Sequence, residues 1–119
     1  MCGRIVQATS PEEIAREFGA SIETASFGGD WEPRWNLAPT SRALIVAPLD
    51  ATGATRTVAR ARWGLVPHWA KDETLGNRLF NARAETVERL PSFRDAFKSG
   101  RVLVPIDAFY EWENPEHLE

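Results

Sequence analysis

The sequence predicts a mixed α+β domain in which antiparallel strands predominate and short helices flank them. Three observations carry this prediction: strand-like runs outnumber helical ones, turn residues rather than long helices separate them, and no internal repeat is visible. With 119 residues and a hydrophobic content of 43%, the chain can bury one modest core. A hydrophobic content this high is not that of a disordered tail. No apolar run reaches the roughly 18 residues that a membrane span needs.

The N-terminal segment predicts a strand followed by a helix. CGRIVQA, residues 2–8, is typical of a short strand. SPEE, residues 10–13, is a capping box with proline at the first helical position. Because Gly19 is a natural C-terminal stop, we expect a helix over residues 11–18.

The middle of the chain predicts a loop and then a β-hairpin. Glycine and proline breakers are spread through residues 20–42, which we expect to be a loop. ALIVAPL, residues 43–49, is typical of a buried strand, which Pro48 must end or place at an edge. TVARARW, residues 57–63, alternates small or apolar residues with arginine as a half-buried strand does, and a turn over 50–56 joins the two strands.

The last third predicts irregular structure, short helices and further strand. WGLVPHW, residues 63–69, contains breakers and is expected to form an aromatic loop. Apolar periodicity predicts short helices near residues 84–89 and 92–99, the second of which stops at Gly100. RVLVPIDAFYEW, residues 101–112, is expected to form one bent strand or two consecutive strands.

Charge and composition limit the classes of function. The net charge of −3 argues against a protein that coats nucleic acid by bulk electrostatics. However, residues 107–119 hold five acids and no base, so the rest of the chain carries a net charge of +2. Residues 34–62 carry five arginines against Asp50 alone, and arginine grips phosphate and stacks on flat rings. Local positive patches are therefore one interpretation, and a solvated strand face is the other.

Cys2 is the most informative single position. If Met1 is removed, Cys2 presents a thiol and a free α-amine on adjacent carbons. The amine has an ordinary pKa of about 8, so much of it is neutral and nucleophilic near physiological pH. An aldehyde can then form an imine that the thiol closes into a five-membered thiazolidine. An internal cysteine cannot do this because its amine lies in a peptide bond, and the alternative is that Cys2 is incidental.

Three further patterns offer chemistry. Aromatic residues flank Glu111, and such neighbours can desolvate a carboxylate and raise its pKa, unless Glu111 simply faces outward. Asn81 and Arg83 place an amide and a guanidinium on one side of an extended segment, which suits phosphate recognition, although Arg83 could equally form a surface pair with Glu85. Trp69 could stack on unpaired bases or lie in the core.

Taken in this order, the segments resemble one family. The matching blocks are CGR at residues 2–4, NLAP at 36–39, WGLVPHW at 63–69, NARAE at 81–85 and RVLVPIDAFYEW at 101–112. The chain resembles the SOS response-associated peptidase (SRAP) family, the abasic-site processing proteins. The resemblance implies a mainly antiparallel, barrel-like SRAP fold and a role in the response to DNA damage.

The resemblance also implies roles for individual residues. Cys2, freed by removal of Met1, would be the nucleophile that captures a ring-opened abasic site in single-stranded DNA as a thiazolidine. Asn81 would hold the reacting cysteine and sugar by hydrogen bonds, and Glu111 would act as acid and base. The residues implied in DNA binding are Arg4 and Arg83, which would hold phosphates, and Pro39 and Trp69, which would shape the channel.

The resemblance covers residues 1–119 as the N-terminal portion of a single SRAP domain, because family members run well beyond this length. Their catalytic histidine lies further on, in a His-x-Arg-Met-Pro-like motif that neither His68 nor His117 matches. We therefore expect a truncated sheet whose unpaired edge could associate with another copy. Residues 117–119 are a candidate vector-derived tail.

The expected partner is single-stranded DNA that contains abasic sites, with no membrane, metal or cofactor. A single cysteine and two histidines are too few for a zinc site. The N-terminus lacks an apolar signal core, so the expected location is the cytoplasm of a bacterial-type cell, at the nucleoid when bound to damaged DNA.

Two other functions remain open. The chain could belong to a cysteine peptidase whose N-terminal cysteine removes Met1 or cuts peptides. It could instead be a noncatalytic binder of single-stranded DNA that uses arginine and tryptophan, whose affinity would depend on salt and not on residue 2.

Overall fold

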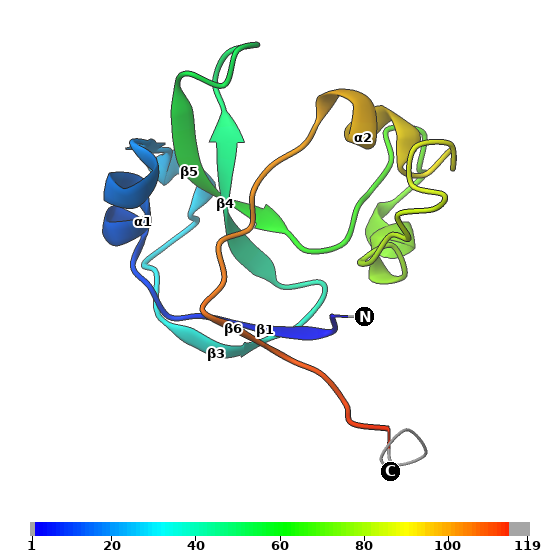
Figure 1. The fold of residues 1–119 in the computed structure, drawn as a ribbon, viewed down its shortest axis with the longest axis horizontal. Coiled ribbons are helices and arrows are strands. Elements are labelled where there is room, and N and C mark those ends of the chain that lie inside the picture. The colour runs from blue at the N-terminus through cyan, green and yellow to red at the C-terminus, as the bar shows by residue number, and fades with distance from the viewer. Residues whose placement is uncertain (1, 115–119) are drawn as a thin grey trace.

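The computed structural model describes residues 2–114, which form two three-stranded sheets (Figure 1). The first sheet has the order β3-β1-β6, and the second has the order β2-β5-β4. The strands of the first sheet are β1 (Arg4–Gln7), β3 (Arg34–Leu37) and β6 (Ala108–Tyr110). Those of the second are β2 (Ser21–Ile22), β4 (Arg42–Pro48) and β5 (Arg56–Arg62). The mixed α+β class is thus confirmed, with β2–β5 the one parallel pairing among these strands.

The first helix, α1 (Pro11–Phe18), spans the predicted residues and packs on the second sheet (Figure 1). The Ser10 side chain accepts a hydrogen bond from the Glu13 amide at 3.2 Å, which satisfies one of the amides left free at a helix start. Gly19 ends the helix with a φ of 59°, in the left-handed region that glycine enters without a steric penalty. The buried face of α1 joins the larger core cluster, formed by Ile14, Ala15, Leu44, Val46 and Val58.

The predicted hairpin is confirmed as β4 and β5. The two strands pair antiparallel in continuous register from Arg42 opposite Arg62 to Pro48 opposite Arg56. Pro48 is the last residue of β4, where its missing amide hydrogen breaks no central ladder bond. The turn between the strands is organised by Asp50, whose carboxylate accepts hydrogen bonds from the backbone amides of Thr52 and Thr55 at 2.9 and 3.2 Å.

The prediction of a loop throughout residues 20–42 is wrong. This segment contains β2, the 3-10 helix η1 (Thr24–Ser26) and β3. The four-residue run of β3 is too short to show a pattern between Pro33 and Pro39. It becomes a strand because β1 pairs with it, placing Ile5 opposite Leu37 and Gln7 opposite Arg34.

Gln7 and Asp107 connect the two ends of the described chain. The Gln7 side chain is 2% exposed and donates to the carbonyls of Leu44 and Pro105, at 3.0 and 2.8 Å. Its oxygen accepts the Leu44 amide at 2.8 Å, so β1 is joined to β4 across the two sheets. The Asp107 carboxylate accepts the backbone amides of Ala8 and Thr9 at 2.7 and 3.1 Å.

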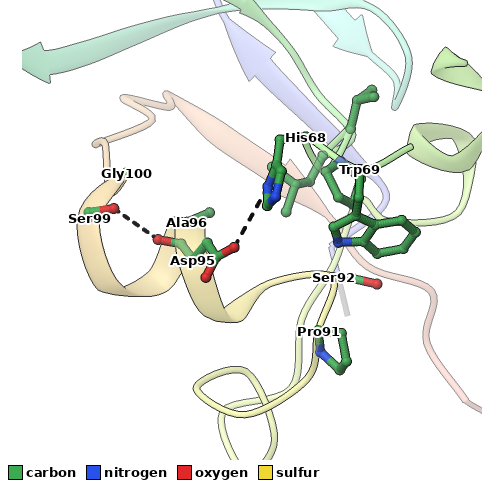
Figure 2. Close-up of a pocket in the computed structure, with 11 residues that line it drawn as sticks. His68, Trp69, Pro91, Ser92, Asp95, Ala96, Ser99 and Gly100 are labelled. Carbon is green, nitrogen blue, oxygen red and sulfur yellow. Dashed lines mark hydrogen bonds and ion pairs between the residues drawn. The ribbon is translucent and has the colours of Figure 1, made fainter. Parts of the chain in front are cut away.

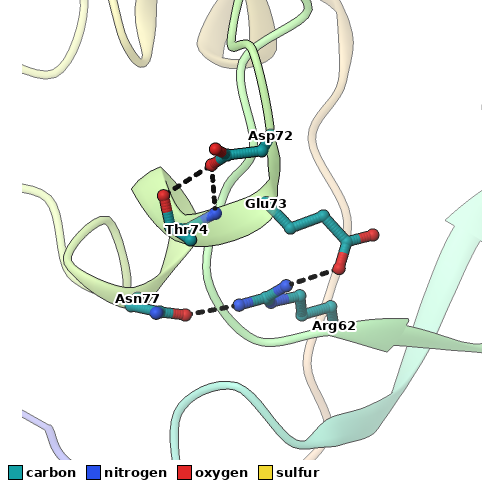
Figure 3. A network of polar contacts seen from close by, with 5 residues as sticks. All are labelled: Arg62, Asp72, Glu73, Thr74 and Asn77. Carbon is teal, nitrogen blue, oxygen red and sulfur yellow. Dashed lines mark hydrogen bonds and ion pairs between the residues drawn. The ribbon is translucent and has the colours of Figure 1, made fainter.

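Residues 64–100 form an irregular excursion on the side of the molecule away from α1 (Figure 1). It contains the 3-10 helix η2 (Glu73–Asn77) and the helix α2 (Arg94–Ser99). Arg62 ties η2 to the hairpin by bonds to Glu73 at 3.1 Å and Asn77 at 2.6 Å (Figure 3). A Cβ at Gly64, whose φ is 130°, would collide with the carbonyl oxygen of Gly76, so only glycine allows this close backbone approach.

The predicted helix near residues 84–89 is wrong, whereas the helix predicted over 92–99 is confirmed from Arg94 onward. Residues 84–89 form successive turns, because only isolated bonds of helical spacing are made, such as the Val87 amide to the Arg83 carbonyl at 2.9 Å. Pro91 follows directly and disfavours helical geometry at the residue before it.

The predicted strand over residues 101–112 is mostly absent. Leu103 makes an isolated antiparallel bridge to Val46, and only Ala108–Tyr110 forms β6. The chain therefore touches the second sheet and then joins the first, but no closed barrel forms among residues 2–114, contrary to the barrel-like expectation. In the same residues no helix is long and apolar enough to cross a membrane. The candidate tail at 117–119 lies outside the described residues.

Candidate active site

Cys2 lies two residues before the start of β1, at one end of the first sheet. Its side chain is half-buried, and the thiol donates a long contact of 3.7 Å to the carbonyl of Arg4. The thiol is thus at the surface of the fold, attached to a strand that pairs on both sides. This arrangement attaches Cys2 to a paired strand while the residue as a whole stays half-buried.

Asn81 contacts Cys2 although 79 residues separate them. Its side-chain amide donates to the Cys2 carbonyl at 2.7 Å, and the side chain is half-buried. The preceding residue is held by Trp63, whose indole donates to the Phe80 carbonyl at 2.8 Å and meets the Phe80 ring edge-on at 6.4 Å between centroids. Because Trp63 follows β5 directly, the hairpin itself positions the asparagine against Cys2.

Arg4 and Glu111 lie around one hollow beside the end of the first sheet. Arg4 pairs with Tyr110 across β1 and β6, and its guanidinium donates to the Asn36 side chain at 3.1 Å. The same register continued by one residue places Gly3 opposite Glu111. The hollow measures about 650 Å³, and its lining includes Gly3, Arg4, Trp35, Asn36, Tyr110 and Glu111.

The aromatic neighbours of Glu111 do not enclose it in the described part of the chain. Tyr110 and Trp112 are 52% and 97% exposed, and Glu111 is itself exposed. The desolvation expected from the sequence is therefore not supplied by these two side chains. Tyr110 instead uses its hydroxyl to donate to the Trp35 carbonyl at 2.9 Å, which braces β6 against β3.

The other three predicted DNA-binding residues lie in separate places. Trp69 is 51% exposed and lines a different hollow of about 290 Å³, next to His68 and α2 (Figure 2). Pro39 is half-buried in the connection between β3 and β4. Arg83 is exposed two residues beyond Asn81. The fold thus brings Asn81 to Cys2 and places Arg4 and Glu111 around a separate hollow that begins at the neighbouring Gly3. Trp69, Pro39 and Arg83 lie outside both groups.

Comparison with known proteins gives the family. The family model described as SOS response associated peptidase (SRAP) matches residues 1–118. The chain belongs to the SRAP family.

Curated relatives and solved structures agree with this assignment. The SRAP chain is 38% identical over 95% of its length to the abasic site processing protein YoqW of Bacillus subtilis, covering 48% of that protein. It is 26% identical over 95% of its length to the abasic site processing protein HMCES of Xenopus tropicalis, covering 39% of that protein. The chain thus spans about half the length, or less, of these relatives.

Two crystal structures of Bordetella bronchiseptica proteins share the fold. One superimposes with a TM-score of 0.67 at 23% identity, covering 92% of the SRAP chain and 50% of the solved one. The other, a phage-related protein, gives a TM-score of 0.61 at 33% identity, with coverages of 94% and 47%. The fold of this chain is therefore shared with both of these proteins.

Sequence reasoning missed three residues that contact or adjoin the candidate site residues. Asn36 orients Arg4, Trp63 fixes the segment before Asn81, and Trp35 lines the hollow with 65% of its surface exposed. All three lie next to or within the sequence blocks that match the family, but the sequence did not show which residues they contact.

An apolar hollow of about 440 Å³ also adjoins Cys2, and its lining includes Cys2, Ile5, Trp63, Leu65, Val102 and Val104. No group of three or more metal-ligating side chains occurs within residues 2–114.

Proposed function

We propose that the protein containing this chain captures abasic sites in single-stranded DNA through a thiazolidine formed by Cys2. The observation that carries the proposal is the 2.7 Å hydrogen bond from Asn81 to the Cys2 carbonyl, which holds the N-terminal residue in place. A residue so positioned converts a flexible chain end into an oriented nucleophile, and orientation lowers the barrier for attack.

The proposed reaction balances with the loss of one water. The open-chain sugar of an abasic site carries an aldehyde at C1′, and the Cys2 α-amine adds to this carbon. The resulting carbinolamine loses its hydroxyl as water and becomes an imine. The thiol then adds to the imine carbon, its proton passing to the nitrogen, and a C–S bond closes the ring. Removal of Met1 must come first, because the amine is otherwise part of a peptide bond.

Three other residues support this chemistry in the proposal. Glu111 lines the hollow beside Gly3 and would protonate the departing hydroxyl and take up the proton that the nitrogen loses as the imine forms. It would then relay the thiol proton to that nitrogen as the ring closes. Arg4, oriented by Asn36, would hold a phosphate next to the reacting sugar. Asn81 would keep the amine and thiol pointed toward the aldehyde.

The relatives support the same class of substrate. YoqW and HMCES are named abasic site processing proteins, and the family name refers to the SOS response. Because the chain spans about half of these relatives, the proposal concerns the whole protein. Residues outside this chain would complete the channel around Pro39, Trp69 and Arg83. A downstream histidine is expected to share the proton transfers.

The test is mass spectrometry of the full-length protein, with Met1 removed, after incubation with a single-stranded oligonucleotide that contains one abasic site. The expected adduct has the mass of protein plus oligonucleotide minus one water, and forms without a reductant. Cys2→Ser keeps the amine but loses the thiol, so its imine should appear only after borohydride trapping. An equal, reductant-independent adduct in Cys2→Ser would overturn the proposal.

Two outcomes would favour the alternatives. Cleavage of peptides by the same preparation, without any DNA adduct, would indicate a cysteine peptidase. Binding that is equal for intact and abasic DNA, and equal for Cys2→Ser, would indicate a noncatalytic binder.

A further inference from the structure

Three arginine side chains surround a hollow on the side of β3 away from the Cys2 end. Arg34 begins β3, Arg42 begins β4 and Arg60 lies in β5, so both sheets contribute. The hollow measures about 150 Å³ and is also lined by Trp31, Asp30 and Glu32. All three belong to residues 34–62, a segment that contains five arginines and a single acidic residue.

None of the three guanidinium groups has a carboxylate partner within 4.0 Å among residues 2–114. Arg42 donates to the Ser26 carbonyl at 2.6 Å and Arg60 donates to the Phe27 carbonyl at 2.6 Å, so both anchor the segment after η1. Each guanidinium carries five N–H groups, and these bonds leave most of them unused. Arg34 makes no side-chain hydrogen bond in the described part of the chain.

The three positive charges repel one another. The pKa of Arg60 is lowered by burial first, and then by the nearby charges of Arg42 and Arg34. Asp30 and Glu32 at the rim offset only two of the three charges. An anion in the hollow would relieve this repulsion and pair with the unused N–H groups.

We propose that this hollow binds a phosphate group of single-stranded DNA at a distance from the reaction centre. The identity of the ligand as DNA rests on the proposed function, whereas the preference for phosphate rests on the guanidinium geometry. Arg34, with all its donors unused, is the main contact, and Arg42 and Arg60 add charge from fixed positions.

The register of the first sheet sets the separation between the hollow and Cys2. Arg34 pairs with Gln7, five residues from Cys2 on β1. At about 3.4 Å per strand residue, this separation is about 17 Å. Stacked nucleotides advance by about 3.4 Å each, so the phosphate would belong to a nucleotide about five positions from the abasic site.

The test compares Arg34→Gln with Arg56→Gln in the full-length protein, using a fluorescent, undamaged 15-nucleotide single strand. Arg56 is the matched control, because it is exposed in β5 and its side chain, among residues 2–114, bonds only to the Gly53 carbonyl within its own hairpin. Loss of one phosphate contact should weaken binding at least 5-fold at low salt and lower the salt slope by about 0.7. Arg56→Gln should bind within twofold of the wild type.

A second variant makes the hollow more positive instead of less positive. Asp30→Asn combined with Glu32→Gln removes two rim charges and leaves every arginine in place, so binding should tighten. Crosslinking of an abasic trinucleotide, which is too short to reach the hollow, should be unchanged by Arg34→Gln.

Three outcomes would overturn the proposal. The first is an equal salt slope for the wild type and Arg34→Gln, and the second is weaker binding after removal of the two rim charges. The third is binding of inorganic phosphate that depends on Arg34 while DNA affinity does not, which would assign the hollow to a free anion. Undamaged DNA contains no aldehyde, so a failure of the Cys2 chemistry would be detected separately by the absence of an adduct.

Discussion

Replacement of Gln7 by leucine should strongly destabilise the fold, because this one side chain joins the two sheets. The side chain is 2% exposed and makes three hydrogen bonds, two as donor and one as acceptor. Leucine has a similar size and fills the space, but it leaves the Leu44 amide, the Leu44 carbonyl and the Pro105 carbonyl without this partner.

The magnitude follows from those three groups. A buried polar group that loses its partner costs about 1–3 kcal/mol, and the amide, which has a single hydrogen to donate, is the most costly. Leucine recovers about 1–2 kcal/mol through its apolar surface. We therefore expect the free energy of unfolding to fall by about 3 kcal/mol, a large share of the total for a domain of this size.

The assay is urea unfolding of the full-length protein, followed by tryptophan fluorescence. The matched control is Thr57→Val, which also removes a buried polar group but breaks a single long bond of 3.4 Å to the Ser21 carbonyl. The control should lose less than about 1 kcal/mol. If Gln7→Leu lost no more than Thr57→Val, the assignment of Gln7 as the connection between the sheets would be refuted.

Two further predictions concern Asp107, which binds the two residues that follow β1, and Asn81, which binds Cys2. Hydrogen bonds from Thr9 lower the pKa of Asp107, so its stabilising contribution is present above the usual aspartate pKa of about 4 and is lost as the pH falls through the lowered value. Asp107→Asn should therefore lower the melting temperature equally at pH 7 and pH 5, and the difference should shrink below pH 4; a constant difference down to pH 2 would contradict this. Asn81→Ala should slow crosslinking of abasic DNA roughly 10-fold without changing affinity for undamaged DNA, since one positioning hydrogen bond is lost. Asn77→Ala, in the same excursion, is the control and should react at the wild-type rate; equal rates for both variants would remove the positioning role.

The predictions that succeeded rest on local signals. The capping box at residues 10–13 and Gly19 fixed both ends of α1, because caps act on amides and carbonyls within one helical turn. The hairpin was predictable because its two strands are adjacent in sequence, one as a continuous apolar run and the other with alternating residues. The interpretation of Cys2 as a nucleophile also rests on a local feature, its place in the chain, and stays a prediction.

The predictions that failed depended on partners far away in sequence. β3 exists because β1 supplies its hydrogen bonds, and the strand predicted over 101–112 shortened to Ala108–Tyr110 where β1 pairs with it. Residues 84–89 have helical periodicity, but Pro91 and the lack of consecutive bonds left them as turns.

The sequence by itself determined the family, the α+β class and the special position of Cys2. Only the tertiary structure decided which residues meet: Asn81 with the Cys2 carbonyl, Gln7 with Leu44, and three arginines around one hollow. The physical reason is the separation along the sequence over which each interaction acts. Capping, turn chemistry and alternation act over a few residues, whereas these contacts form only after two sheets have paired segments from both ends of the chain.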